Sequence, residues 1–418
     1  MLFLTSVLLL AFGALKPTVA QDLFVPGTWR KSSNSRPLAE RIAISQNAIN
    51  TILPQLNSAT GEFHGIPPGI GYWQSGNAFS AMANQDYFAG TSSNKAQVVM
   101  NLKNVFKLRP TYDQYGCAGL AQSLRLSADM YMLCRYNDDA LWWAQAALYA
   151  YRAYGDTVLL ANAIATWNRV TTFVVTPAQA SAGKHPNKSF ALSPTCDGVT
   201  MAGGVFWRPT TDDQAINSIT TGLYITVSAF LAEITKDARY KNAAILSANW
   251  VKAHNLNGNI VLDSVNAHDC SRSPSTWLFT YNSGKYIEGL SVLADVTGDS
   301  QWRTMMVNIL ATAVKFSAWQ GSDGIITEGS STTSNNDSVG FKAIFIRGLY
   351  EAFARNPSNT NLRILVRSYI DVQYNALLDL AANGNSYSAN WHGPPQGFTS
   401  WGQLAALDVL TSAIIANN

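Results

Sequence analysis

Two adjacent acids stand directly before a pair of tryptophans. Asp138 and Asp139 are followed by Trp142 and Trp143. Neighbouring carboxylates repel each other and are costly to bury, so a shared apolar site drives their pKa values apart. Two such carboxyl groups suit acid–base chemistry at a glycosidic bond, and flat rings suit the apolar faces of sugars. The pair also suits a helix start, where Asn137 or Asp138 would cap the first turn.

The sequence offers no other catalytic signature. The five histidines stand apart and fit no metal-ligand spacing, and no glycine-rich phosphate loop follows a strand. A Gly-x-Ser-x-Gly motif is also missing. We therefore expect neither a metal nor a cofactor.

Aromatic residues accompany polar ones in the segments between predicted helices, at 71–77, 203–208 and 277–284. A single cluster of this kind is best explained by a ring that closes the core beneath a loop. Several clusters beside paired acids indicate sugar-binding subsites, in which Asn and Asp bind hydroxyl groups and rings cover the sugar.

Composition and termini indicate a secreted protein. Of 418 residues, 47% are hydrophobic and only 13% are charged, with the basic residues scattered, so no nucleic-acid partner is expected. Residues 1–20 form a short apolar run that ends in a small-residue cleavage pattern, which predicts a secretory signal peptide. Residues 410–418 are too short and too polar for a lipid-anchor signal. We expect residues 21–418 to form one catalytic domain that is monomeric and not anchored to a membrane.

Four cysteines allow at most two disulfides in an oxidising compartment, in three complete pairings. Cys196 and Cys270 lie in polar, loop-like surroundings and are the first pair we expect to be bridged. Cys134 lies on an apolar helical stretch, as a buried thiol would, and Cys117 is the fourth. Two sequons, at Asn187 and Asn336, are candidate glycan sites.

Helical periodicity dominates the chain, and strand-like alternation is scarce. Helix pairs turn at 154–156, 235–240 and 297–302, each time with an Asp at the start of the new helix. About a dozen helices in antiparallel pairs can form an open superhelix or close into a barrel of six pairs, and the uneven repeats favour the barrel. The predicted helices cover 38–57, 74–88, 96–107, 119–134, 138–154, 158–174, 213–234, 239–254, 283–297, 300–318, 339–355, 361–377 and 401–416.

These residues, taken in order, resemble glycoside hydrolase family 76, the endo-α-1,6-mannanases and their fungal cell-wall relatives. The resemblance runs from about Trp73 to Asp408. It rests on the acid pair with its tryptophans and on the blocks 203–207, 217–223, 280–284, 341–347 and 403–408. The family implies an all-α fold, the (α/α)6 barrel, together with a retaining mechanism that needs no cofactor.

The resemblance also implies roles for individual residues. Asp138 would be the nucleophile and Asp139 the general acid/base. With Asp138 half outside the helix and Asp139 within it, their carboxyl groups could lie about 5–5.5 Å apart, as retaining enzymes require. Substrate contacts are expected from Trp73, Asn77, Trp207, Asn217, Asp263, Tyr281 and Asn282.

The sequence therefore predicts a secreted retaining hydrolase that cleaves internal α-1,6 linkages of mannan. Two alternatives stay open. A transglycosidase would pass the same glycosyl intermediate to another sugar. A mannan-binding protein without catalysis would keep the aromatic groove but would not need both acids.

Overall fold

A computed structural model describes residues 21–63, 69–109, 136–331, 333 and 335–418. The predicted signal peptide, the predicted helix over 119–134, Cys117 and Cys134 lie outside the described residues.

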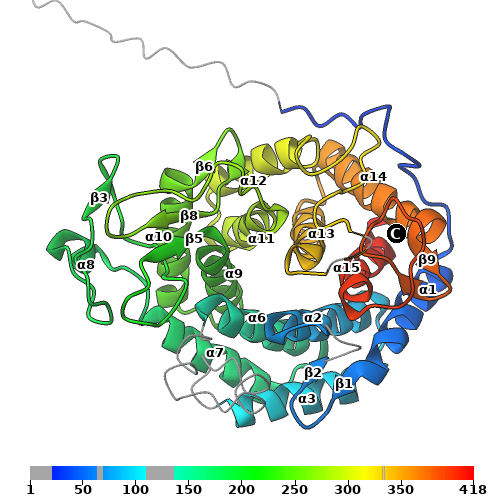
Figure 1. Ribbon diagram of the computed structural model, residues 1–418, viewed down its shortest axis with the longest axis horizontal. Coiled ribbons are helices and arrows are strands. Elements are labelled where there is room, and N and C mark those ends of the chain that lie inside the picture. Colours follow the sequence, from blue (N-terminus) through cyan, green and yellow to red (C-terminus); the bar gives the residue numbers. More distant parts are fainter. Residues whose placement is uncertain (1–20, 64–68, 110–135, 332, 334) are drawn as a thin grey trace, which may run out of the picture.

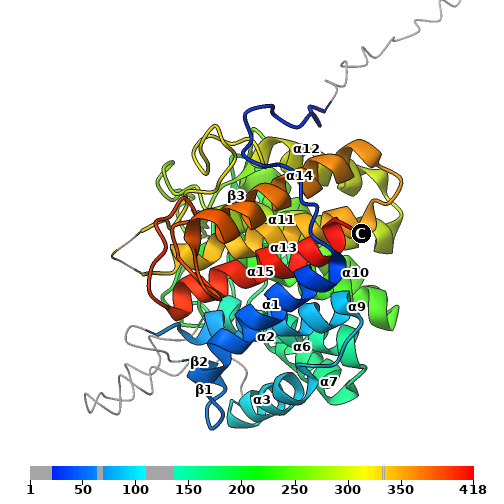
Figure 2. The ribbon, with the colours of Figure 1, turned by 90° about the vertical axis from the view of Figure 1, so that its right-hand side faces the viewer.

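Within the described residues, six helices stand side by side in a closed inner ring, each in contact with the next (Figure 1). They are α2 (Tyr72–Ala89), α6 (Asn137–Tyr154), α9 (Ser218–Thr235), α11 (Thr280–Thr297), α13 (Ser338–Arg355) and α15 (Ser400–Ala416). Figure 2 shows three of them, α11, α13 and α15, lying side by side.

An outer layer of helices packs against this ring. It consists of α1 (Leu38–Ile52), α3 (Lys95–Leu108), α7 (Thr157–Thr171), α10 (Ala238–His254), α12 (Ser300–Ala313) and α14 (Thr360–Ala376). Two concentric layers of paired helices make an (α/α)6 barrel, so the predicted fold class is confirmed.

Short hairpins decorate the barrel in the described part of the chain. Strand β5 (Ala215–Asn217) pairs antiparallel with β8 (Ser264–Asn266), which brings the segment before α9 beside the segment before α11. The other pairs are β1 (Leu56–Asn57) with β2 (Glu62–Phe63), β3 (Thr195–Cys196) with β4 (Val199–Thr200), β6 (Leu256–Asn257) with β7 (Ile260–Val261), and β9 (Ala382–Asn383) with β10 (Ser386–Tyr387). Short helical segments are η1 (Leu53–Gln55), α8 (Pro177–Ala182) and η2 (Leu377–Ala381).

The predicted turns between paired helices are present. Gly155 ends α6 in the left-handed conformation, with φ +71°, and the Asp156 carboxylate then accepts from the first backbone N–H groups of α7. Asp237 and Asp299 cap α10 and α12 in the same way.

Some predicted boundaries were wrong. The helix expected from 213 begins at Ser218, because residues 215–217 form β5 and Asn217 caps the helix. The helix expected to run to 57 ends at Ile52, and Pro54 lies in the 3-10 turn that follows. The helix expected to reach 318 ends at Ala313.

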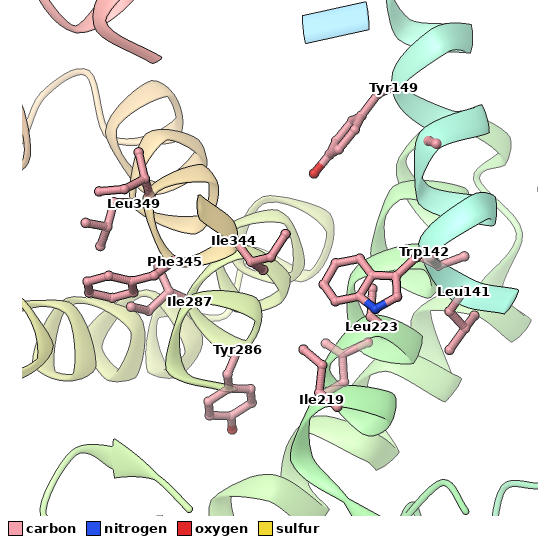
Figure 3. Packing of buried hydrophobic residues seen from close by; sticks show 14 of the residues in the cluster. Leu141, Trp142, Tyr149, Ile219, Leu223, Tyr286, Ile287, Ile344, Phe345 and Leu349 are labelled. Carbon is pink, nitrogen blue, oxygen red and sulfur yellow. The ribbon is translucent and has the colours of Figure 1, made fainter. Parts of the chain in front are cut away.

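The inner helices are buried on nearly every side. Helix α9 is long and hydrophobic enough to span a membrane, yet 83% of it is buried within the barrel. Helices that are apolar all round occur in the cores of large proteins, as here. Figure 3 shows buried side chains of α6, α9, α11 and α13, with Trp142 and Tyr149 extending from the same side of α6.

The expected disulfide is present. Cys196 and Cys270 are bridged across 74 residues of sequence, joining β3 to the loop that follows β8.

Helices α11 and α13 approach each other so closely that only glycine fits at their contact. A Cβ on Gly348 would overlap the backbone oxygen of Gly284. We expect Gly348→Ala to destabilise the protein by roughly 1–3 kcal/mol, since overpacking forces the backbones apart. Urea unfolding measures this loss.

Gly27→Ala is the matched control, because no atom lies within 4 Å of a Cβ at Gly27. Equal stability of the two variants would contradict the close approach of the helices.

Candidate active site

All six inner helices begin at the same rim of the barrel, and their first turns and preceding loops surround one cavity of about 680 Å³. Four carboxylates and many aromatic rings line it. The lining residues are Gly69, Gly71, Tyr72, Trp73, Gln74, Tyr136, Asp138, Asp139, Trp142, Trp207, Ala215, Asn217, Asp263, Ser264, Trp277, Phe279, Tyr281, Asp337, Phe341 and Trp401.

The start of α6 is held by the segment that carries Trp207. The backbone N–H of Asn137 donates to the Trp207 carbonyl at 2.8 Å, and the Asn137 side chain donates to the Phe206 carbonyl at 2.8 Å. The N-cap position is Tyr136, and no side chain caps the helix. The prediction that Asn137 or Asp138 caps this helix was therefore wrong, as was the placement of Asp138 half outside it.

Asp138 is nearly buried, and both of its oxygens accept hydrogen bonds. Oδ1 accepts from the Asp139 backbone N–H at 3.0 Å, and Oδ2 accepts from the Trp207 indole N–H at 3.1 Å. Burial raises the pKa of Asp138 to about 7, although these hydrogen bonds favour the ionised form and oppose the shift.

Asp139 differs from its neighbour in its partners. Within the described part of the chain, no hydrogen-bond donor reaches its carboxyl group. Burial raises the pKa of Asp139 well above its usual range, and the negative charges of Asp138 and Asp337 add to this shift. Asp138 is therefore the first of the pair to ionise, and Asp139 is the one that keeps its proton.

Asp263, between β7 and β8, also lines the cavity. Its Oδ1 accepts from the Asn282 side chain at 3.0 Å, and its backbone oxygen accepts from the N–H of Ser218 at the start of α9. Burial raises the pKa of Asp263 as well. The neighbouring Asn217 caps α9, with its side-chain oxygen accepting from Thr220 N at 3.2 Å.

Aromatic rings form a continuous path along the cavity wall, from the exposed Trp277 to Trp142 beside the acids. Successive ring centroids are 6.2, 5.4, 6.1 and 5.6 Å apart. The path runs through Trp277, Phe279, Phe341, Trp73 and Trp142. Tyr281 stacks on Phe341 at 3.9 Å.

Most of the residues expected in the site meet in this cavity. Those that line it are Trp73, Asp138, Asp139, Trp207, Asn217, Asp263 and Tyr281.

Asn77 and Asn282 do not line the cavity, contrary to prediction. Asn77 is buried one helical turn beyond Trp73, where it accepts from Arg347 at 2.6 Å. Asn282 is buried behind Asp263 and orients that carboxylate.

Sequence reasoning missed Asp337 as a site residue, because it was noticed only as the middle residue of a sequon. The sequence did carry a signal for it, because Asp337 directly precedes an apolar helix. In this barrel every inner helix begins at the cavity, so a polar residue before such a helix is a candidate site residue. Among the described residues, no group of three His, Cys, Asp or Glu side chains could hold a metal ion.

The fold and this cavity define a helical-barrel protein whose inner helices begin around one acidic site lined by aromatic rings. Residues 189–418, more than half of the chain, match the model of glycosyl hydrolase family 76, and the chain belongs to that family. It is 25% identical over 231 residues to the mannan endo-1,6-α-mannosidase of Saccharomyces cerevisiae. That match covers 52% of this chain and 50% of the relative, so it spans about half the relative's length.

Solved structures share the fold. One of them is an inactive variant of the α-1,6-mannanase of Salegentibacter sp. HEL1_6, with two adjacent aspartates replaced, in complex with α-1,6-mannotriose. It aligns with a TM-score of 0.73 at 15% identity over 90% of this chain and 99% of that chain. Dfg5 from Chaetomium thermophilum, in complex with glucosamine, aligns with a TM-score of 0.65 at 18% identity over 93% and 92% of the two chains.

The Trp207 indole favours the ionised form of Asp138 against the effect of burial. Trp207→Phe keeps a ring but removes the N–H that stabilises the carboxylate, so we expect the pKa of Asp138 to rise further. Carbon-13 NMR titration of the aspartate carboxyl groups measures this shift. Trp277→Phe, in the same cavity but without a bond to Asp138, should leave the pKa unchanged. An unaltered Asp138 titration in Trp207→Phe would show that the indole does not stabilise the ionised form.

Proposed function

We propose that this chain is a secreted retaining glycoside hydrolase that cleaves internal α-1,6-mannosidic linkages of mannan. The proposal rests mainly on one observation: two adjacent carboxyl groups in a cavity lined by aromatic rings have different hydrogen-bond partners. Asp138 has two donors that favour its ionised form, as a nucleophile needs. Asp139 has a neighbouring negative charge that keeps it protonated, as a general acid needs.

The reaction follows from these two states. A carboxylate oxygen of Asp138 attacks the anomeric carbon while the bond to the leaving oxygen breaks, and the proton of Asp139 passes to that oxygen. Asp139, now ionised, takes a proton from water as the water oxygen attacks the anomeric carbon and releases Asp138. Two inversions at one carbon retain its configuration.

The relatives support mannan as the substrate. The Saccharomyces cerevisiae relative is named as a mannan endo-1,6-α-mannosidase. The Salegentibacter structure holds α-1,6-mannotriose in a variant that is inactive after two adjacent aspartates were replaced. This chain has two pairs of adjacent aspartates, and only Asp138 and Asp139 line the cavity; Asp212 and Asp213 do not.

Secretion is part of the proposal. Residues 1–20 carry the pattern of a signal peptide, and the disulfide between Cys196 and Cys270 is of a kind that persists in oxidising compartments.

Transfer to another sugar is the second candidate function. The chain shares its fold with Dfg5 from Chaetomium thermophilum, which was crystallised with glucosamine. The aromatic walls beside the acids could bind an acceptor sugar and exclude water, and the same two aspartates would serve both reactions.

Removing either acid should have a distinct effect. Asp138→Ala should abolish turnover even of activated substrates, whereas Asp139→Ala should retain turnover of substrates with good leaving groups and respond to added azide. The double variant should release nothing from linear α-1,6-mannan, from which the wild type should release short oligosaccharides. Product analysis distinguishes hydrolysis from transfer, because products longer than the substrate would indicate transfer.

Asp22→Asn is the control and should be fully active, because Asp22 is exposed and does not line the cavity. An active double variant would refute the catalytic assignment. Absence of azide rescue in Asp139→Ala would argue that the two roles are exchanged.

The exposed ring at the outer end of the aromatic path should bind a distant sugar of long substrates. Trp277 is 48% exposed, which is unusual for so large a ring. We expect Trp277→Ala to lower kcat/KM on long oligosaccharides about fivefold, equivalent to roughly 1 kcal/mol of stacking, and to spare the shortest substrates.

Tyr87→Ala is the matched control, since Tyr87 is equally exposed but lies near the far end of α2. An equal effect of Trp277→Ala on all chain lengths would exclude a distant subsite.

A further inference from the structure

Asp337 occupies the N-cap position of α13 but does not cap that helix. Its carboxylate instead reaches across the cavity rim to α2. Oδ1 accepts from the Trp73 indole N–H at 3.2 Å and from the Gln74 side-chain amide at 2.6 Å. An aspartate at this position usually accepts from the backbone N–H groups of its own helix. The Asp337 carboxylate instead joins α13 to α2.

Trp73 is held by the same turn of α13 at a second point. A Cβ on Gly340 would lie 3.1 Å from Cη2 of Trp73, so the glycine leaves room for the ring to rest against the helix. The indole stacks on Trp142 at a centroid distance of 5.6 Å. Asp337 and Gly340 thus set the orientation of the Trp73 ring, which stacks on Trp142 beside the catalytic pair.

Gln74 is almost fully buried, and its side-chain oxygen has no partner among the described residues. A buried acceptor without a donor is costly unless a ligand supplies one. Because Asp337 binds the amide nitrogen of Gln74, the oxygen is the atom of this side chain that is left without a donor.

We propose that Asp337 is a positioning residue of the catalytic cleft: it orients Trp73 and Gln74 as one sugar subsite and places a third negative charge opposite Asp138 and Asp139. This proposal rests on the proposed function for its ligand, a neutral hexose unit of the polysaccharide. It goes beyond that function in assigning the subsite and the residue that builds it.

The charge of Asp337 also acts on the catalytic pair, since it raises the pKa values of Asp138 and Asp139. Other titratable or charged groups face the same space from the surrounding elements. They are Tyr72 with Arg109 beside it, Tyr136 with Arg208 beside it, Asp263, Tyr281 and Lys285, which lies over the Trp142 ring. None of these changes in a variant of Asp337, so a shift in such a variant reports on Asp337 itself.

Two variants separate the two effects of Asp337. Asp337→Asn keeps an oxygen acceptor for Trp73 and Gln74 but removes the charge. Its KM should stay within about twofold of the wild type, while the basic limb of the pH profile of kcat/KM moves to lower pH, because the acid/base loses a neighbour that holds its proton. Asp337→Ala loses both the oxygen acceptor and the charge. The basic limb should therefore move as far as it does in Asp337→Asn, and KM should rise roughly tenfold.

Circular dichroism tests the positioning without any substrate. The stacked pair of Trp73 and Trp142 should give an exciton couplet in the wild type and in Asp337→Asn, and a diminished couplet in Asp337→Ala. Trp73→Phe keeps a ring but has no N–H to hold, while Gln74 still binds Asp337. In the double variant, Asp337→Ala should therefore raise KM by a smaller factor than it does in the wild type.

The proposal is overturned if Asp337→Ala keeps the wild-type KM and couplet, if Asp337→Asn leaves the basic limb in place, or if the double variant is additive. Asp22→Asn controls for loss of a surface charge. A wild type without activity on mannan would refute the proposed function, and the couplet would still decide whether Asp337 orients Trp73.

Discussion

The arrangement of the site depends on one constraint: all six inner helices of the barrel point the same way. In the described part of the chain, an outer helix follows each inner helix before α15, and each of the inner helices begins at the same rim. The first turns of α2, α6, α9, α11, α13 and α15, or the loops directly before them, therefore meet around a single cavity. Trp73 and Asp337 are more than 200 positions apart in the sequence. They become neighbours because both stand at the start of an inner helix.

The same constraint sets up opposing electrostatic effects. Helix starts carry partial positive charge, and their convergence favours carboxylates at the rim. Burial and mutual repulsion act against this, and the pKa values of Asp138, Asp139 and Asp263 are all raised, so desolvation outweighs the dipoles. Hydrogen bonds then distinguish the two acids, because Trp207 stabilises only the carboxylate of Asp138. Local partners rather than the helix start decide which acid ionises first.

Below the cavity, buried charged side chains join the inner helices to one another through ion pairs and hydrogen bonds. Arg347 on α13 binds Asp408 on α15 at 2.8 Å and Asn77 on α2, while Lys285 on α11 binds Glu288 at 2.6 Å and Gln145 on α6 at 2.8 Å. These buried charges find their partners in only one arrangement of the inner helices. The contacts therefore restrict how the helices can rotate or slide. Asn77, expected to bind substrate, belongs to this layer instead. It lies one helical turn beyond Trp73, which is enough to move a side chain from the cavity wall into the core.

The sequence by itself determined the local features of this protein. Periodicity predicted the helices, Asp156, Asp237 and Asp299 marked helix starts, and Asp138 and Asp139 were recognisable because two adjacent acids before tryptophans are unusual at any site. Only the tertiary structure decided which distant residues meet. Asn282 lies behind Asp263, and Asp337 binds α2 rather than capping its own helix, because such contacts depend on helix direction and rotation. Periodicity specifies which face of a helix is apolar. The packing of the six inner helices decides which neighbour that face and the start of the helix will contact.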